Sequence, residues 1–167
     1  MIIAIVHADK QWGIGKNGDM MFSLKKDMKF FRETTSGNTV VMGGNTLRSL
    51  PNQKPLKNRV NIVLTRGQVC DECVVVRDFE ALKDQLKMRD SQEKIYIMGG
   101  GVIYQELIDY CDFALVTKVD AIGGADVFFP NLDEKENFVC VEESEEIEDG
   151  DYKIRFTTYK NTAKKPL

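Results

Sequence analysis

Short apolar runs rich in β-branched residues alternate along the chain with segments of helical periodicity. The runs span residues 2–6, 39–42, 60–65, 74–76, 95–98 and 113–119, and the helical segments lie near 24–34, 79–89 and 102–110. Strands that alternate with helices in this way are typical of βα units, whose strands form a mostly parallel sheet. The pattern therefore predicts an α/β fold.

The C-terminal part of the chain has a different pattern. Segments 138–142 and 153–159 flank an acidic stretch, 142–151, that contains Gly150. Strands joined in this way are typical of an antiparallel hairpin, and a run of acids is ordinarily a solvated turn. We therefore expect one α/β domain over residues 1–167, with a central, mostly parallel sheet, an antiparallel C-terminal edge hairpin and about four flanking helices.

Composition and charge narrow the function classes. The chain has 167 residues, of which 43% are hydrophobic and 29% are charged, the balance of one folded globular domain. Its formal net charge of −3 and the lack of a basic face argue against nucleic-acid binding. The first residues carry no basic leader, and no apolar run is long enough to span a bilayer. We expect a cytoplasmic monomer that binds neither nucleic acid nor a membrane.

Four cysteines lie at positions 70, 73, 111 and 140. Only Cys70 and Cys73 have the spacing of a metal-binding pair, and zinc would need two further ligands nearby. The sole histidine, His7, is far away in the sequence. We expect reduced thiols and no metal site.

Three of the predicted strands run into residues suited to contact a phosphate. Residues 43–46 read Gly-Gly-Asn-Thr, Thr65 precedes Arg66, and residues 99–101 are all glycine. In an open α/β sheet, ligands bind at the carboxyl ends of the strands, where glycine lets a ligand approach the backbone. Tight packing can also require glycine, but three such turns on one edge favour a phosphorylated ligand.

Residues 13–18, Gly-Ile-Gly-Lys-Asn-Gly, match the G-x-G-x-x-G pattern of dinucleotide-binding folds. That interpretation requires the motif to follow a strand directly and to open a helix. Here residues 7–12 separate it from the first strand, and residues 19–22 show no helical periodicity. We therefore interpret residues 9–23 as a long loop, of the kind that often acts as a lid or a binding loop.

Asp27 lies on the apolar face of the first predicted helix. Ser23 is the expected N-cap, and Leu24, Met28 and Phe31 form an apolar stripe that Asp27 shares. A buried carboxylate is costly unless it is paired and hydrogen-bonded. Its partner is either an internal group, such as a lysine or a backbone N–H, or a ligand that presents two parallel N–H donors.

With these residues, nearly the whole chain resembles dihydrofolate reductase. The resemblance rests on Ile14-Gly15, Asp27 in its helix, Val41-Met42-Gly43 with Thr46, Ser49-Leu50, Pro55-Leu56 with Arg59 and 61–64, Gly99-Gly100-Gly101 with Tyr104, Thr117, and Asp126 with Phe129-Pro130. Each motif is weak alone, and their order and separations together are specific. The resemblance implies an enzyme that uses NADPH to reduce dihydrofolate.

On the substrate side, the resemblance implies that Asp27 binds N3 and the 2-amino group of the pterin, with Thr117 supporting that network through water. Arg59 would bind the glutamate α-carboxylate, a task suited to a guanidinium. The residues expected to line the substrate slot are Ile5, Val6, Met28, Phe31, Leu50 and Leu56.

On the cofactor side, the resemblance implies a mobile loop at residues 13–19 over the nicotinamide. The strand ends would hold the phosphates, the pyrophosphate and the adenosine. The expected cofactor-binding residues are His7, Ile14, Gly15, Asn17, Gly18, Asp19, Met20, Gly43, Gly44, Asn45, Thr46, Leu64, Thr65, Arg66, Arg77, Met98, Gly99, Gly100, Gly101, Val102, Ile103 and Tyr104.

The implied reaction transfers a hydride from the nicotinamide to C6 of the pterin, while N5 gains a proton. Asp27 would lie on the far side of the pyrimidine ring from N5, so we expect it to fix the ring and favour protonation while water delivers the proton. The expected catalytic residues are Asp27, Thr117 and Phe22. The family commonly has tryptophan at the Phe22 position, and phenylalanine lacks the indole N–H that usually holds an ordered water.

Two further positions depart from the family pattern. An arginine is common where Gly44 stands, so we expect a weaker grip on the 2′-phosphate of the cofactor, with Arg66 as its main partner and Arg77 nearby. His7 stands where a small alanine is usual, and its side chain either reaches the site or packs at the strand end.

Two alternative functions stay open at this point. A riboflavin-pathway pyrimidine reductase would have a similar fold and the same cofactor, but it has no need for Asp27 together with Arg59. A non-catalytic nucleotide-binding module would explain the glycine turns, but not an acid on an apolar helix face.

Overall fold

The computed structural model describes residues 1–69 and 71–167. The metal-like pair considered above includes Cys70, which lies outside the described residues. Within the described residues, no group of three or more His, Cys, Asp or Glu side chains is arranged to hold a metal ion. Nor does any helix in this part of the chain combine the length and the apolar character needed to cross a membrane.

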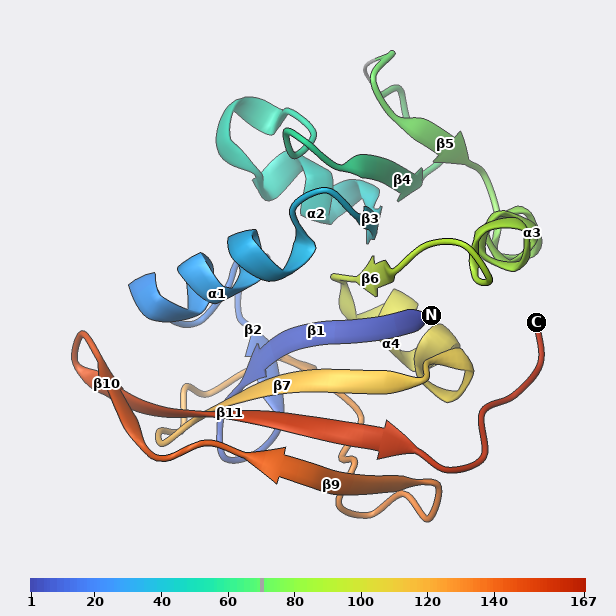
Figure 1. Cartoon of the computed structure of the whole chain (residues 1–167). Coiled ribbons are helices and arrows are strands. Elements are labelled where there is room, and N and C mark those ends of the chain that lie inside the picture. The colour runs from blue at the N-terminus through green and yellow to red at the C-terminus, as the bar shows by residue number, and fades with distance from the viewer. Residues whose placement is uncertain (70) are drawn as a thin grey trace.

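Most of the strands join one sheet, whose order is β10-β11-β7-β1-β6-β3-β4-β5, with β9 also paired to β11 (Figure 1). All pairs from β7 to β5 are parallel, whereas β11 is antiparallel to β7, β9 and β10. The strands are β1 (Ile2–Ala8), β3 (Thr39–Gly43), β4 (Val60–Leu64), β5 (Val74–Val76), β6 (Ile95–Ile97), β7 (Phe113–Val119), β9 (Phe138–Glu143), β10 (Ile147–Asp149) and β11 (Tyr152–Asn161). The expected mostly parallel sheet with an antiparallel edge is confirmed.

Within the described residues, four α-helices flank this sheet, in agreement with the expected number. They are α1 (Lys25–Thr35), α2 (Gly44–Ser49), α3 (Phe79–Arg89) and α4 (Gly101–Leu107), with short 3₁₀ turns η1 (Pro51–Gln53) and η2 (Ile108–Tyr110). The helical pattern near 102–110 thus divides into α4 and η2, and α2 is the fourth expected helix, which the periodicity did not locate.

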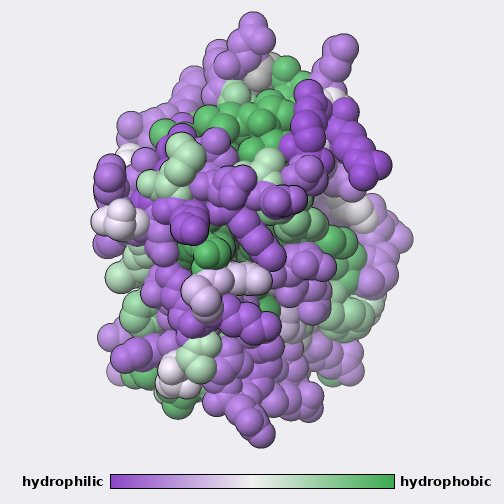
Figure 2. All heavy atoms as spheres, turned by 90° about the vertical axis from the view of Figure 1, so that its right-hand side faces the viewer, coloured by the Kyte–Doolittle hydropathy of each residue, from purple (hydrophilic) through white to green (hydrophobic). Residues whose placement is uncertain are grey.

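Alternation along the strands divides the core into two layers. One cluster joins Ile3 and Ile5 of β1 to Phe31 of α1 and Leu47 of α2. The other joins Ile2 of β1 to Leu82 of α3 and Leu107 of α4. Because successive strand side chains point to opposite faces, α1 and α2 cover one face of the sheet and α3 and α4 the other. The surface seen in Figure 2 is mostly hydrophilic, with hydrophobic residues between the polar ones.

The C-terminal hairpin differs in one respect from the expectation. β9 pairs with β11 as predicted, but the Gly150 turn joins β11 to β10, so the acidic stretch 142–151 is not simply a turn. Ile147 explains the difference, because it packs with Phe22, Leu24 and Ile154 and so anchors a strand among the acids.

The loop expected at residues 9–23 contains a short strand. β2 (Gly13–Gly15) pairs with β8 (Val127–Phe128), and no helix begins until Lys25, so the standard phosphate-binding interpretation of the glycine motif is rejected. The buried Asp9 carboxylate organises this region, because it accepts hydrogen bonds from the backbone N–H groups of Gln11, Gly13 and Gly123.

An ion-pair network joins the N-terminal amine to the C-terminal segment. Lys164 Nζ lies 2.9 Å from both Asp90 Oδ2 and Asp112 Oδ2, and the N-terminal amine of Met1 lies 2.8 Å from Asp90 Oδ1. Burial alone would raise the pKa of Asp90, but the hydrogen bonds and charges of the amine and Lys164 outweigh it and lower that pKa below its ordinary value. The stabilisation from Asp90 is therefore present above the unfolded-state pKa of about 4 and is lost as the pH falls through the lower folded-state pKa.

We expect Lys164→Met to lower the Tm at neutral pH by about 2–4 °C, the shift that corresponds to roughly 1 kcal/mol in a chain of this length. The deficit relative to wild type should shrink as the pH falls from 7 toward 2, because protonated Asp90 no longer pairs with Lys164. Thermal unfolding followed by circular dichroism measures both effects, with the exposed Lys160→Met as a control. A deficit that is the same at both pH values would contradict this role.

Candidate active site

Asp27 of α1 is held between two side chains from neighbouring strands. The Thr117 hydroxyl of β7 donates to Asp27 Oδ1 at 2.6 Å, and His7 Nδ1 of β1 lies 3.2 Å from Asp27 Oδ2. His7 and Thr117 are register partners across the β1–β7 pair, so they lie side by side under the helix. The Thr117 contact is direct, whereas a water-mediated contact was expected, and the His7–Asp27 contact was not predicted.

The first turn of α1 is fixed by a residue distant in sequence. The expected N-cap Ser23 does not cap the helix, and the N-cap position, Leu24, forms no side-chain hydrogen bond. Instead, the buried Asp149 accepts the backbone N–H groups of Lys26 and Asp27 through Oδ2, at 2.9 and 3.1 Å. Because these N–H groups have no partner inside the helix, Asp149 both caps α1 and fixes Asp27 over the sheet.

The expected apolar lining falls on both sides of the sheet. Ile5, Phe31, Leu50 and Leu56 belong to one hydrophobic cluster on the Asp27 face, and Met28 is 53% exposed on α1. Val6 packs against the other cluster, so its side chain does not join this lining. If Val6 contacts a substrate, it does so through its backbone.

Tyr104 has a structural role in addition to its expected place near a cofactor. Its buried hydroxyl donates to the backbone oxygen of Ile5 at 2.7 Å, and its ring packs edge-on against Phe129. Burial raises the pKa of Tyr104 above its ordinary value, so the hydroxyl stays neutral and keeps donating. The contact ties α4 to β1, two residues before His7.

Arg59 lies beside another guanidinium, that of Arg32. Its Nη1 donates to Thr35 Oγ1 and its Nε to the Lys57 oxygen, both at 3.0 Å. Burial and the charge of Arg32 lower the pKa of Arg59, although a guanidinium stays protonated at neutral pH. Two neighbouring cations favour an anion between or near them, such as a carboxylate.

The glycine-rich strand ends were expected to bind a phosphorylated ligand, and packing explains only some of their glycines. A Cβ at Gly101 would lie 2.6 Å from Val127 Cγ1, so packing alone requires glycine there. At Gly100 the nearest atom to such a Cβ is Thr46 Oγ1 at 3.8 Å, and no positive φ demands glycine. Gly100 therefore leaves open backbone beside a hydroxyl, which suits the close approach of a ligand.

The surroundings of Gly44 leave no room for the arginine that is common at this position. A Cβ at Gly44 would lie 2.6 Å from Thr65 Oγ1 and 3.3 Å from Arg48 Nη1. Arg48, one helical turn further along α2, thus places its guanidinium beside Gly44, and its Nη2 donates to Asn45 Oδ1. Arg48 was not among the expected residues, although its i+4 spacing from Gly44 was a usable signal.

The two arginines that were expected at the cofactor differ in their contacts. Arg77 Nη1 donates to the backbone oxygens of Thr65 and Gly67, at 3.0 and 2.6 Å, and so braces the loop after β4. Arg66 is exposed and forms no ion pair within the described part of the chain. Arg48 and Arg66 are therefore the cations whose guanidinium groups are most available to an anion here.

The other expected cofactor residues lie along the same edge and in the loop. Leu64 ends β4, Gly43 ends β3, and the Gly43 N–H donates to the Gly99 oxygen at 2.9 Å. In the loop, the Asn17 N–H donates to Asp126 Oδ2, while Lys16 and Asp19 close a turn through two backbone hydrogen bonds. The remaining members are the half-buried Ile14, Gly15 and Met98, the buried Ile103, and the exposed Gly18, Met20 and Val102.

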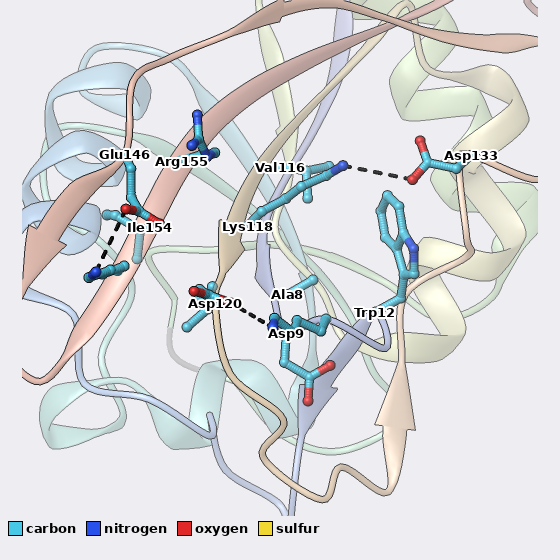
Figure 3. Close-up of a pocket in the computed structure, with 13 residues that line it drawn as sticks. Ala8, Asp9, Trp12, Val116, Lys118, Asp120, Asp133, Glu146, Ile154 and Arg155 are labelled. Atoms are coloured by element: carbon cyan, nitrogen blue, oxygen red, sulfur yellow. Dashed lines mark ion pairs between the residues drawn. The ribbon is translucent and has the colours of Figure 1, made fainter.

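A hollow of about 400 Å³ lies elsewhere, among β1, β7, β11 and the segment after β1 (Figure 3). Several of its charged side chains form ion pairs, including Lys10 with Asp120 at 2.8 Å and Lys118 with Asp133 at 3.7 Å. None of the expected site residues lines it. Its cations are largely compensated from within, so we do not assign the active site to it.

The fold and the site define an α/β protein with a nearly buried carboxylate, Asp27. Glycines and arginines follow the carboxyl ends of its strands β3, β4 and β6. The family model described as "Dihydrofolate reductase" matches residues 1–161. The chain is similar to the dihydrofolate reductases of Bacillus subtilis (strain 168), 33% identical over 98% of both chains, and of Staphylococcus haemolyticus, 31% identical over 95% of this chain and 94% of that one. A bifunctional dihydrofolate reductase-thymidylate synthase of Daucus carota is 36% identical over 78% of this chain and 28% of its own length. The chain therefore belongs to the dihydrofolate reductase family.

Proposed function

We propose that the protein reduces 7,8-dihydrofolate to 5,6,7,8-tetrahydrofolate with NADPH, by hydride transfer to C6 and protonation of N5. The observation that carries this proposal is the Asp27 carboxylate, placed among apolar side chains and fixed by Thr117 in a chain that matches the family from residue 1 to 161. A fixed carboxylate in such surroundings suits a flat heterocycle that presents two adjacent N–H donors.

The chain's own residues would bind, orient and protect the reacting ring. Asp27 would accept the N–H groups of the pyrimidine part, and Thr117 would keep the carboxylate in the plane of that ring. The negative charge favours the protonated pterin, while N5 takes its proton from water. Phe31, Leu50 and Leu56 would exclude bulk water from the ring, and Arg59 would hold the glutamate carboxylate.

NADPH fits the glycine-rich edge, and when bound it supplies the hydride. The open backbone at Gly100 with the nearby Thr46 hydroxyl suits the pyrophosphate, and Arg48 and Arg66 suit the 2′-phosphate. The 2′-phosphate is what separates NADPH from NADH, so cations at this end support a preference for NADPH.

Two alternatives are less well supported. A pyrimidine reductase of the riboflavin pathway has no need for a carboxylate anchor together with the Arg59 and Arg32 pair, and a nucleotide-binding module has no need for Asp27. Loss of NADPH absorbance tests the proposal, because it should require dihydrofolate. No loss with dihydrofolate, or equal loss with a ribosylated aminopyrimidine, would contradict it.

We also propose a cytoplasmic monomer. Large exposed hydrophobic side chains are spread over several elements, including Met28 on α1, Met88 on α3 and Val102 on α4, rather than gathered on one helix. Size-exclusion chromatography with light scattering should give one chain per particle, and a stable dimer would contradict the proposal.

A cofactor prediction follows from the guanidinium groups beside Gly44. Arg48→Ala and Arg66→Ala should each lower the ratio of kcat/KM with NADPH to that with NADH by about tenfold, and the double variant by more, because a charge-assisted contact contributes roughly 1.5–3 kcal/mol. The ratio is measured at saturating dihydrofolate and fixed ionic strength, since salt screens exposed charges.

Arg155→Ala is the matched control, because Arg155 is an exposed arginine on β11, near the other end of the sheet. We expect this variant to keep the wild-type ratio. An unchanged ratio in the Arg48 and Arg66 variants would mean that the 2′-phosphate is held elsewhere. A Gly44→Arg variant is not a useful test, because its side chain would displace Thr65.

A further inference from the structure

The only histidine of the chain is in direct contact with the candidate catalytic acid. His7 Nδ1 lies 3.2 Å from Asp27 Oδ2, while Thr117 donates to Oδ1 of the same carboxylate at 2.6 Å. The His7 and Asp27 side chains are only 10% and 13% exposed. Each carboxylate oxygen is therefore approached by a side chain from a different strand.

The chemistry of the pair determines where the imidazole protons lie. An ionised carboxylate can only accept, so the contact with Asp27 requires a hydrogen on His7 Nδ1. His7 Nε2 is then a bare acceptor in the neutral ring or a second donor in the imidazolium. Nε2 is closed to solvent and has no hydrogen-bond partner among the described residues. Since buried polar atoms are nearly always paired, the hydrogen bond from Nδ1 to Asp27 is the one polar contact that the described residues offer to this ring.

Phe22 packs beside His7 and carries no hydrogen-bond donor on its side chain. The Phe22 ring lies 6.2 Å from the His7 ring and 4.7 Å from that of Tyr152, and it is 7% exposed. It places apolar surface beside His7 and has no N–H to offer. In this chain, therefore, the side-chain donor to Asp27 Oδ2 comes from β1 and not from position 22.

We propose that His7 is a positioning residue of this active site: its Nδ1–H orients the Asp27 carboxylate together with the Thr117 hydroxyl. The proposal rests on the proposed reduction of dihydrofolate and deepens it. Two fixed donors on the two oxygens hold the carboxylate plane, which decides whether a flat ring can form two parallel hydrogen bonds with it.

A pair of substitutions of similar shape isolates the donor. His7→Asn keeps an N–H group near the Nδ1 position, and His7→Leu has nearly the same shape without any donor. We expect His7→Leu to lower kcat/KM for dihydrofolate by about ten- to a hundredfold, the range for a hydrogen bond to a charged group. His7→Asn should lose at least about threefold less than His7→Leu, and the KM for NADPH should change little in either variant.

Rescue from the neighbouring position separates orientation from packing. His7→Leu combined with Phe22→Trp supplies an indole N–H on the ring that packs beside position 7, and we expect this double variant to regain at least about threefold of the lost kcat/KM. Wild-type activity in His7→Leu would overturn the proposal. Equal losses in His7→Leu and His7→Asn, with no gain from Phe22→Trp, would also overturn it, because packing alone would then explain the effect.

Nitrogen NMR provides a readout that needs no turnover. Because the chain has one histidine, a ¹⁵N-histidine-labelled sample gives one pair of ring signals, and both belong to His7. We expect Nδ1 to carry a proton in the wild type, and Asp27→Asn to change the ring signals. A neutral ring protonated on Nε2, with signals indifferent to Asp27→Asn, would overturn the proposal. If Nδ1 is protonated but dihydrofolate is not reduced, the proposed function fails while the His7–Asp27 contact stands.

Discussion

Asp27→Asn should lower kcat/KM for dihydrofolate at neutral pH by about a hundredfold or more, within the range for groups that act in acid–base catalysis. Asparagine keeps the shape and can still accept hydrogen bonds from Thr117 and His7, so the fold around α1 should persist. What it removes is the negative charge that favours the protonated pterin. Activity should partly recover at acid pH, where the substrate gains its proton from solvent.

Initial rates measured from about pH 5 to about pH 9 test this effect. Glu33→Gln is a suitable control, because it removes one carboxylate from the exposed face of the same helix. The control should keep the wild-type profile. Wild-type kcat/KM at neutral pH in Asp27→Asn would remove Asp27 from the mechanism.

Arg59→Leu should raise the KM for dihydrofolate by about ten- to a hundredfold, because a guanidinium–carboxylate contact is among the stronger hydrogen-bonded pairs. In the wild type, a bound carboxylate also relieves the repulsion between Arg59 and Arg32, which favours binding. Arg59→Leu loses this contribution as well, so the KM should rise further. The KM for NADPH should change far less, and a pterin substrate without the glutamate should be nearly indifferent to the change.

Arg32→Leu is the matched control for this prediction. It removes the neighbouring charge but leaves the Arg59 hydrogen bonds to Thr35 and Lys57 in place, so we expect a smaller rise in KM. Thermal unfolding should be compared for both variants, because Arg59 is half-buried. An equal loss for substrates with and without the glutamate would move Arg59 out of the substrate site.

The sequence predicted the parts of the fold that depend on local pattern. Parallel strands and the longer helices follow from the alternation of β-branched runs with amphipathic segments. The fourth expected helix, α2, could not be located from periodicity, because it has only six residues and Gly, Asn, Thr and Ser among them are poor helix formers. β10 was missed because one apolar residue, Ile147, anchors it in an acidic stretch.

The candidate site divides in a similar way. Asp27 could be identified because burying an acid on an apolar helix face is costly unless the acid has a partner. A single sequence is enough to recognise such a residue. The partners of the site could not be identified by such a rule. Asp149 caps α1 from 122 residues away, and His7 meets Asp27 only because β1 and β7 lie under the helix. Such contacts depend on topology, which periodicity does not determine.

The most direct measurement of the central claim follows deuterium from the reduced cofactor to the pterin. NADPH carrying deuterium at the transferable C4 position should give tetrahydrofolate with one deuterium at C6, observed by NMR, and N5 should carry only solvent-derived hydrogen. In Asp27→Asn at neutral pH, the label should reach C6 at least about a hundredfold more slowly. If NADPH is oxidised while the pterin stays unlabelled, or if the label appears at another carbon, the account of this protein as a dihydrofolate-reducing enzyme is contradicted.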